Sequence, residues 1–195
     1  MRWQVVVFVS KDIGVFTKHG FSIIQYILKK MPTLLKWNES NKINGDHISL
    51  EVKQVYGWII TKDHHLVLVS KDNVKWQFPG GKPNLEENFV DTLTREVLEE
   101  TSLDISEMDK SFFGYYEIIS EDEPPFLQVR YIVICDKNSK ELKLGVKNED
   151  KDQVNEDIVK YVASYNIKEA TELIPWLGGT EEYKTFMKIF KNIKR

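Results

Sequence analysis

Three glutamates, Glu96, Glu99 and Glu100, have the spacing that places side chains on one face of a helix. Like charges at i and i+4 weaken an isolated helix by roughly 0.2–0.5 kcal/mol, so another group must offset the repulsion between Glu96 and Glu100. A divalent cation does so, because it attracts both carboxylates at once. The spacing therefore favours a metal site with these three glutamates as its ligands.

A helix that is anchored on one side would hold these carboxylates in place. Its apolar residues recur at helical spacing and predict a face that packs against a sheet; they are Phe89, Val90, Leu93 and Val97. Directly before this helix, Gly80 and Gly81 predict a tight turn with accessible backbone. We therefore expect a glycine turn, a loop and then the acidic helix.

The segment from Gly81 to Leu103 resembles the signature of the Nudix hydrolases. That signature is a glycine, five residues, a glutamate, seven residues, Arg-Glu, an aliphatic residue, any residue, Glu-Glu, any residue, a glycine and an aliphatic residue. Its positions here are Gly81, Glu87, Arg95, Glu96, Val97, Glu99, Glu100, Ser102 and Leu103. Ser102 replaces the signature glycine and is the single departure. Long fixed spacing with many charged positions makes this a far more specific motif than a lone glycine-rich loop.

The resemblance implies a metal-dependent active site with Glu96, Glu99 and Glu100 as metal ligands. It also implies that Arg95, in company with Glu87, orients or balances the acidic cluster. The alternative for Arg95 is an exposed i,i+4 ion pair with Glu99, which contributes only about 0.3–0.5 kcal/mol. Because these residues match the signature, we expect Glu99, Glu96 and Arg95 to be catalytic.

A further carboxylate from outside the signature often completes such sites. The resemblance points to Glu156, before a late strand, as a catalytic general base. Asp152 and Asp157 compete with Glu156 for this role.

Carboxylate oxygens are hard ligands that suit Mg²⁺ or Mn²⁺, and Mg²⁺ completes its coordination with water and substrate phosphate oxygens. Bound metal would neutralise the phosphates, orient a water for in-line attack on phosphorus and stabilise the leaving phosphate. The predicted reaction class is therefore metal-dependent hydrolysis of a pyrophosphate.

Three residues near the glycine turn are candidates for substrate binding. Lys82 could reach a phosphate or simply be exposed, and Gly81 allows close approach of the backbone. Trp76 adjoins the turn and could stack on a base, although core packing fits an aromatic residue in a strand equally well.

Ser102 stands where glycine would accept a left-handed conformation that ends the helix. A serine in that conformation costs roughly 1 kcal/mol. Because the carboxylates are intact, we expect an altered cap or local strain with catalysis preserved.

The rest of the chain predicts an α+β fold in which helices cover a mixed sheet, and the resemblance implies the Nudix α/β/α sandwich. Expected strands are 52–61, 66–70, 112–119, 126–135 and 158–163, and expected helices are 167–173 and 181–193. We place a Nudix hydrolase domain at 48–195 and an N-terminal extension at 1–47, with a strand at 3–9, a helix at 21–31 and a connection at 38–46. A homodimer contact, a substrate lid and a packing layer are open roles for the extension, and the packing layer is preferred.

Composition sets further bounds. A net charge of −3 and a pI near 5.9 give no electrostatic footprint for nucleic acid or anionic membrane, so DNA or RNA binding is not expected. The single cysteine, Cys135, lies in an apolar run and is interpreted as a buried thiol in a reducing compartment. No apolar stretch has the length of a membrane span, and we expect a cytoplasmic protein.

These observations together predict a metal-dependent Nudix pyrophosphohydrolase. The preferred substrate is a nucleoside diphosphate linked to another group, either a nucleoside triphosphate or an oxidised nucleotide such as 8-oxo-dGTP, cleaved by attack of water on phosphorus. Two alternatives stay open: a Nudix-fold module that binds a nucleotide without cleaving it, and an RNA 5′-end pyrophosphohydrolase.

Overall fold

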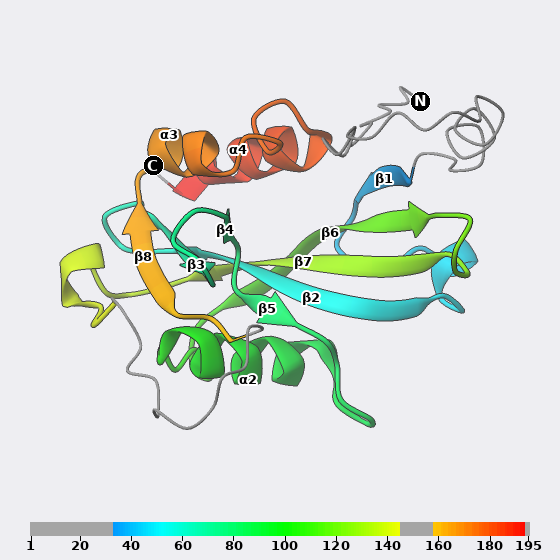
Figure 1. Cartoon of the computed structure of the whole chain (residues 1–195), viewed down its shortest axis with the longest axis horizontal. Helices are drawn as coiled ribbons and strands as arrows, with labels where there is room; N and C mark the ends of the chain where they lie inside the picture. The colour runs from blue at the N-terminus through cyan, green and yellow to red at the C-terminus, as the bar shows by residue number, and fades with distance from the viewer. Residues whose placement is uncertain (1–32, 145–157, 194–195) are drawn as a thin grey trace, which may run out of the picture.

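A mixed β-sheet forms the centre of the computed structural model, which describes residues 33–144 and 158–193 (Figure 1). Its strands are β1 (Leu34–Glu39), β2 (Glu51–Ile60), β3 (Leu66–Ser70), β4 (Trp76–Gln77), β5 (Gly80–Gly81), β6 (Lys110–Ile119), β7 (Phe126–Ile134) and β8 (Tyr161–Tyr165). Across the described residues the strand order is β1-β6-β7-β2-β3-β4, with β5 beside β2 and β8 beside β3. The central pair β2 and β7 is parallel, and the other pairs are antiparallel.

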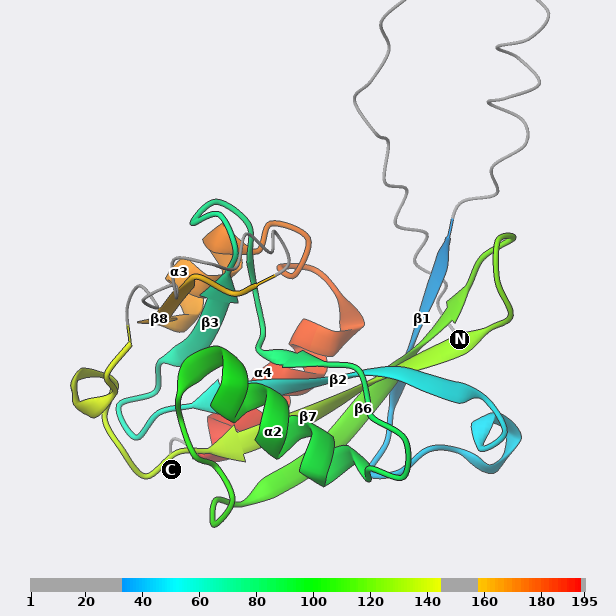
Figure 2. The ribbon, with the colours of Figure 1, turned by 60° about the horizontal axis from the view of Figure 1, so that its bottom comes forward.

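Helices cover both faces of the sheet (Figure 1, Figure 2). Helix α2 (Phe89–Thr101) lies on one face, and α3 (Ile167–Leu173) and α4 (Glu181–Ile193) lie on the other. Side chains of β2 alternate between the two cores: Val55 and Ile59 pack with Leu93 of α2, whereas Trp58 packs with Phe186 of α4. A strand buried on both faces requires this period of two. The predicted α/β/α sandwich with a mixed sheet is therefore confirmed.

Close packing on β2 holds α2 in place. Leu93 and Val97 are fully buried, and a Cβ built on Gly57 of β2 would lie 2.9 Å from Cδ1 of Leu93. The expectation that Val90 joins this apolar face is wrong, because Val90 is 39% exposed. Val90 lies in the first turn of α2, before Leu93 and Val97, which pack against the sheet. The buried positions of α2 are instead Thr92, Leu93, Val97 and Thr101.

Strand β1 belongs to the expected N-terminal extension and was not predicted as a strand. It pairs antiparallel with β6, from Leu34 opposite Ile119 to Glu39 opposite Gly114. The indole N–H of Trp37 donates to Oγ1 of Thr185 on α4 at 3.1 Å, so this strand is also tied to the helical layer. The expected strand at 3–9 and helix at 21–31 lie outside the described residues, and the boundary at residue 47 stays a prediction.

Most of the other expected elements are confirmed with small shifts at their ends. The late strand expected at 158–163 is displaced, because β8 pairs with β3 only from Tyr161 opposite Ser70 to Tyr165 opposite Leu66. The backbone N–H of Lys160 still donates to the Ser70 carbonyl oxygen at 3.0 Å, but the strand pairing begins at Tyr161 because β3 ends at Ser70. Helix α4 begins as predicted: Oγ1 of Thr180 accepts the backbone N–H of Tyr183 at 3.1 Å.

Cys135 is 1% exposed, which confirms the buried thiol, and burial raises the pKa of this thiol. In the part of the chain that the structure describes, no helix combines the length and the apolar composition that crossing a membrane requires.

Candidate active site

The N-terminal cap of α2 sets where the acidic helix begins. Oδ1 of Asn88 accepts the backbone N–H groups of Val90 and Asp91, each at 2.9 Å. These bonds satisfy two of the donors that the first turn of a helix leaves unpaired. The cap thereby fixes the rotation of the helix and the direction in which its glutamates point.

The two glycines of β5 let the glutamates of α2 approach the backbone of the sheet. A Cβ on Gly81 would lie 2.4 Å from the Glu96 carboxyl group, and one on Gly80, whose φ is +146°, would lie 2.1 Å from the Val55 carbonyl oxygen. The backbone N–H of Gly80 donates to Oε2 of Glu100 at 2.8 Å. The expected turn is thus a short strand paired with β2. Gly80 requires glycine because of its φ and its contact with backbone, and a side chain at Gly81 would displace the Glu96 carboxyl group.

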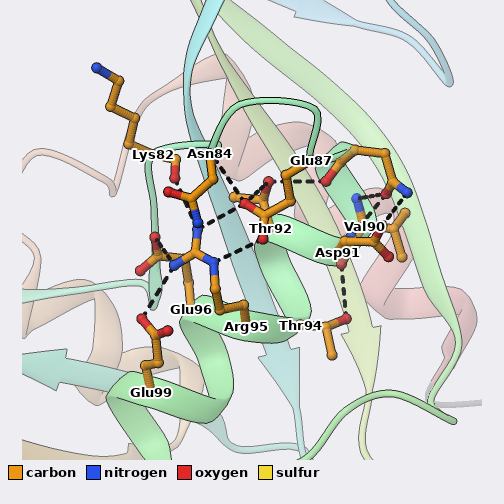
Figure 3. Close-up of polar contacts among 11 residues, drawn as sticks. Lys82, Asn84, Glu87, Val90, Asp91, Thr92, Thr94, Arg95, Glu96 and Glu99 are labelled. Atoms are coloured by element: carbon orange, nitrogen blue, oxygen red, sulfur yellow. Dashed lines mark hydrogen bonds and ion pairs between the residues drawn. The ribbon is translucent and has the colours of Figure 1, made fainter.

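Arg95 is the hub of the acidic cluster (Figure 3). Its Nε and Nη2 donate to the two oxygens of Glu87 at 2.8 and 2.9 Å, a bidentate pair. Nη1 donates to Oε1 of Glu96 at 2.8 Å and to Oε2 of Glu99 at 3.2 Å, while Nη2 also donates to the Lys82 carbonyl oxygen at 3.1 Å. All five guanidinium N–H donors are therefore used. Arg95 thus makes the i,i+4 pair with Glu99 and, in addition, a bidentate pair with Glu87.

Glu87 connects this hub to the loop before the helix. The Arg95 guanidinium lowers the pKa of Glu87 to about 2, and the Asn84 backbone N–H and the Thr92 hydroxyl group act in the same direction. The same pairing raises the pKa of Arg95. The ion pair therefore stays charged at neutral pH and ties the loop to α2.

The three proposed metal ligands share one face of α2 but point to different partners. Glu96 lies against Gly81, Glu100 accepts from Gly80, and Glu99 reaches Arg95 with a side chain that is 58% exposed. Within residues 33–144 and 158–193, no three His, Cys, Asp or Glu side chains converge as a ready-made ion site. The three glutamates nevertheless suit Mg²⁺ or Mn²⁺, because carboxylate oxygens are hard donors. Arg95 engages one oxygen of Glu96 and one of Glu99, so a cation held by the second oxygen of each carboxylate would not need to displace Arg95.

Ser102 adopts the expected left-handed conformation, with φ 58° and ψ 18°. Its backbone N–H donates to the Leu98 carbonyl oxygen at 2.9 Å, which closes the last turn of α2. The serine thus ends the helix in the geometry of a glycine cap, and the glutamates upstream keep their positions.

The remaining predicted site residues divide into three groups. Lys82 is exposed, and Figure 3 shows its side chain directed away from the glutamates. Trp76 is 7% exposed and packs edge-on against Tyr165 at 5.2 Å, yet it also lines a cavity. Glu156 and its competitors Asp152 and Asp157 lie outside the described residues.

The cavity beside Trp76 has a volume of about 950 Å³ and lies on the face of the sheet that α3 and α4 cover. Sequence reasoning did not single out most of its walls, which come from segments distant in the chain. Its aromatic walls are Trp37, Tyr56, Trp76, Phe78, Tyr116 and Trp176. Gln128 and Arg130 add polar groups from β7. An aromatic cavity with a few polar groups is typical of a small-molecule site.

Comparisons with known proteins agree with the signature on α2. A family model described as NUDIX domain matches residues 52–177. The Bacillus subtilis pyrophosphohydrolase BsRppH is similar in structure, with 17% identity over 68% of this chain and 72% of that chain and a TM-score of 0.48. The Caenorhabditis elegans Ap4A hydrolase has 14% identity over 74% of this chain and 99% of its own, with a TM-score of 0.48. A NUDIX hydrolase from Nitrosomonas europaea has 18% identity over 74% and 91%, with a TM-score of 0.44.

No curated protein matches the chain at a significant level. The family model, in contrast, spans well over half of it and contains the complete acidic cluster with Gly81, Glu87 and Arg95. The chain belongs to the NUDIX family of hydrolases.

Proposed function

We propose that this NUDIX hydrolase cleaves the pyrophosphate linkage of a nucleotide in a divalent-metal-dependent reaction. The observation that carries the proposal is the arrangement of Glu96 and Glu100 against the backbone of β5, with Glu99 on the same helix face. This arrangement presents oxygen ligands beside the half-buried Gly81, where a diphosphate would approach.

Each residue of the cluster has a proposed role in this reaction. Glu96, Glu99 and Glu100 hold the ion, and bound Mg²⁺ or Mn²⁺ supplies neutralisation of phosphate charge and activation of water. Arg95, clamped by Glu87, keeps Glu96 and Glu99 aligned along the helix.

The bond changes follow from hydrolysis of an acid anhydride. A water oxygen attacks one phosphorus in line, the bond from that phosphorus to the bridging oxygen breaks, and the leaving phosphate takes the electron pair. A carboxylate accepts the proton that the water loses, and Glu156 is our candidate for this base. Lys82 and the Gly81 backbone are proposed to contact the phosphates, the lysine after a rotation of its exposed side chain.

The proposed substrate is a nucleoside triphosphate or an oxidised nucleotide such as 8-oxo-dGTP. Support comes from the aromatic cavity next to β5, in which Trp76 offers a ring face to a base. We keep a cytoplasmic location as a prediction from the sequence, and a homodimer contact stays one of the open roles of the N-terminal extension.

Release of phosphate and pyrophosphate from a substrate panel tests this function. The panel contains nucleoside triphosphates, 8-oxo-dGTP, ADP-ribose, dinucleoside polyphosphates and RNA with a 5′-triphosphate or a cap, each with Mg²⁺ or Mn²⁺. Glu99→Gln should lower turnover by at least about 100-fold. Glu107→Gln makes the same chemical change at an exposed glutamate beyond α2 and should leave turnover unchanged.

The panel also separates the proposed function from its alternatives. Metal-dependent release from a small nucleotide that Glu99→Gln abolishes supports the proposal. Preference for the RNA substrates would favour 5′-end hydrolysis. Folded protein that binds a nucleotide and cleaves none of the panel would make it a binding module.

A further inference from the structure

The cavity on the α3 and α4 face has a buried ion pair at its polar end. Arg130 lines the cavity and is 5% exposed, and its Nε donates to Oε1 of Glu182 at 2.9 Å. Glu182 is fully buried and also accepts the indole N–H of Trp58 at 2.9 Å. A buried ion pair is weak support for stability, because desolvating two charges offsets most of their attraction. Its position at a cavity wall suggests a role in binding.

Arg130 is held rigidly between neighbouring groups. Its guanidinium lies 4.6 Å from the centre of the Tyr56 ring and 5.4 Å from that of Tyr116. Nη1 donates to the Val129 carbonyl oxygen at 3.3 Å and Nη2 to Oε1 of Gln128 at 3.2 Å. Among the described residues, these bonds leave one N–H on each terminal nitrogen without a protein acceptor. Arg130 therefore presents two adjacent donors and no acceptor.

Charge balance indicates what part of a ligand would meet these donors. The Arg130 charge is compensated by Glu182, so this end of the cavity offers little net attraction to a phosphate. A neutral group with two neighbouring acceptors fits it better. The acceptor pair O6 and N7 of guanine is such a group, whereas adenine places an N6 donor beside N7.

The cavity lies next to the proposed catalytic cluster. Tyr56 lines the cavity and pairs in the sheet with Gly80, whose N–H donates to Glu100. Burial raises the pKa of Tyr56, the nearby Arg130 charge lowers it, and the charges of Glu100 and Glu96 raise it. Tyr56 thus lies between the cavity and the strand that contacts Glu100, and a ligand with its base in the cavity would extend its phosphates toward this strand.

The size and the rim of the cavity also fit a base. A volume of about 950 Å³ lies at the upper end of the range for small-molecule sites. At its edge, Trp176 is 42% exposed and Val74 is 74% exposed, so apolar groups are available at the mouth. Trp37 adds an aromatic wall from β1, which lies outside the family match.

We propose that this cavity holds the base of the substrate nucleotide, and that Arg130, positioned by Glu182, selects guanine through its O6 and N7 acceptors. The assignment rests on the proposed function and narrows its substrate class to guanine nucleotides. It also favours guanine over 8-oxoguanine, because oxidation at C8 places a hydrogen on N7 and removes that acceptor.

Binding of nucleoside monophosphates in EDTA tests the assignment without relying on turnover. Isothermal titration should show GMP and IMP, which share O6 and N7, binding at least about fivefold more tightly than AMP, the low end for a bidentate arginine contact. 7-Deaza-GMP and 8-oxo-GMP should lose most of this advantage. Equal affinity for GMP and AMP, or full affinity for 7-deaza-GMP, would overturn it.

Two variants separate base selection from stacking. Arg130→Lys keeps the charge but loses the fork, so the GMP preference over AMP should fall below about threefold. Trp176→Ala should weaken GMP and AMP alike, because stacking does not depend on the base. A preserved GMP preference in folded Arg130→Lys would contradict the role of Arg130. If that variant does not fold, the relative affinities of the unaltered protein for GMP, AMP and 7-deaza-GMP test the assignment instead.

Failure of this inference is distinguishable from failure of the proposed function. Glu99→Gln should lose turnover but keep the GMP preference, because α2, which carries Glu99, lies on the opposite face of the sheet from the cavity (Figure 1). A GMP preference without hydrolysis of any nucleotide would leave the cavity assignment standing and refute the proposed function. Hydrolysis of nucleotides without any base preference would support the proposed function and refute the cavity assignment.

Discussion

The carboxyl group of Glu96 lies so close to Gly81 that a single added methyl group would come within 2.4 Å of it. Gly81→Ala should therefore push Glu96 off its position on α2 and lower turnover by about 100-fold, the loss that a displacement of about 1 Å can cause. Steady-state kinetics with saturating Mg²⁺ measure this effect. Gly45→Ala is the matched control, because a Cβ there meets no atom within 4 Å. Normal turnover in Gly81→Ala would show that Glu96 does not need its present position.

Arg95 should be sensitive even to a conservative exchange. Arg95→Lys retains a positive charge but cannot satisfy Glu87, Glu96 and Glu99 at once, because lysine lacks the planar fork. We expect turnover to fall at least about tenfold and the Mg²⁺ concentration for half-maximal activity to change. Kinetics across a Mg²⁺ titration measure both quantities. If Arg95 made only the exposed pair with Glu99, the lysine variant would behave like the unaltered protein.

Glu87 should contribute stability that depends on pH. Its pKa is about 2 in the folded chain, below an ordinary value of 4.5. A carboxyl group with a lowered folded pKa stabilises the protein above its unfolded pKa, and that contribution is lost as the pH falls from about 4.5 toward 2. Urea unfolding of the unaltered protein and Glu87→Gln should differ at pH 7, and this difference should shrink at pH 3. A difference that is constant with pH would mean that the Arg95 pair is not its source.

Ser102→Gly should stabilise the protein. Serine at φ 58° carries a steric cost that glycine avoids, although glycine gains entropy in the unfolded chain. The net gain should be about 0.5–1 kcal/mol in the free energy of unfolding, with turnover within about twofold. Urea denaturation measures the gain, and Ser102→Ala is the control because it keeps the steric cost. A glycine variant that is less stable, or one with greatly increased activity, would contradict this account of the cap.

The sequence was sufficient to predict those elements whose structure depends on residues close together in the chain. Helix α2 could be predicted because Leu93 and Val97 repeat at helical spacing. The association of Arg95 with Glu87 was implied by the resemblance to the Nudix signature. The left-handed conformation at Ser102 was expected because the signature has a glycine at that position.

Features that depend on pairing distant segments could not be predicted in this way. Leu34–Glu39 is a short strand whose order comes from pairing with β6, and its own sequence shows no strong alternation. Arg130 of β7 and Glu182 of α4 meet between the sheet and the helical layer, with no local signal linking them. Only the alternation of β7 could have hinted that Arg130 points toward the helical layer.

The pairing of β1 with β6 and the packing of α4 have a consequence for where this protein can be cut. A fragment limited to the family match, residues 52–177, would lose β1 and leave the β6 edge ready to pair with another molecule. It would also lose Phe186, whose ring lies 4.1 Å from Trp58 in the core. We therefore expect such a fragment to aggregate. The segment that matches the family, residues 52–177, is smaller than the segment that this protein needs to fold.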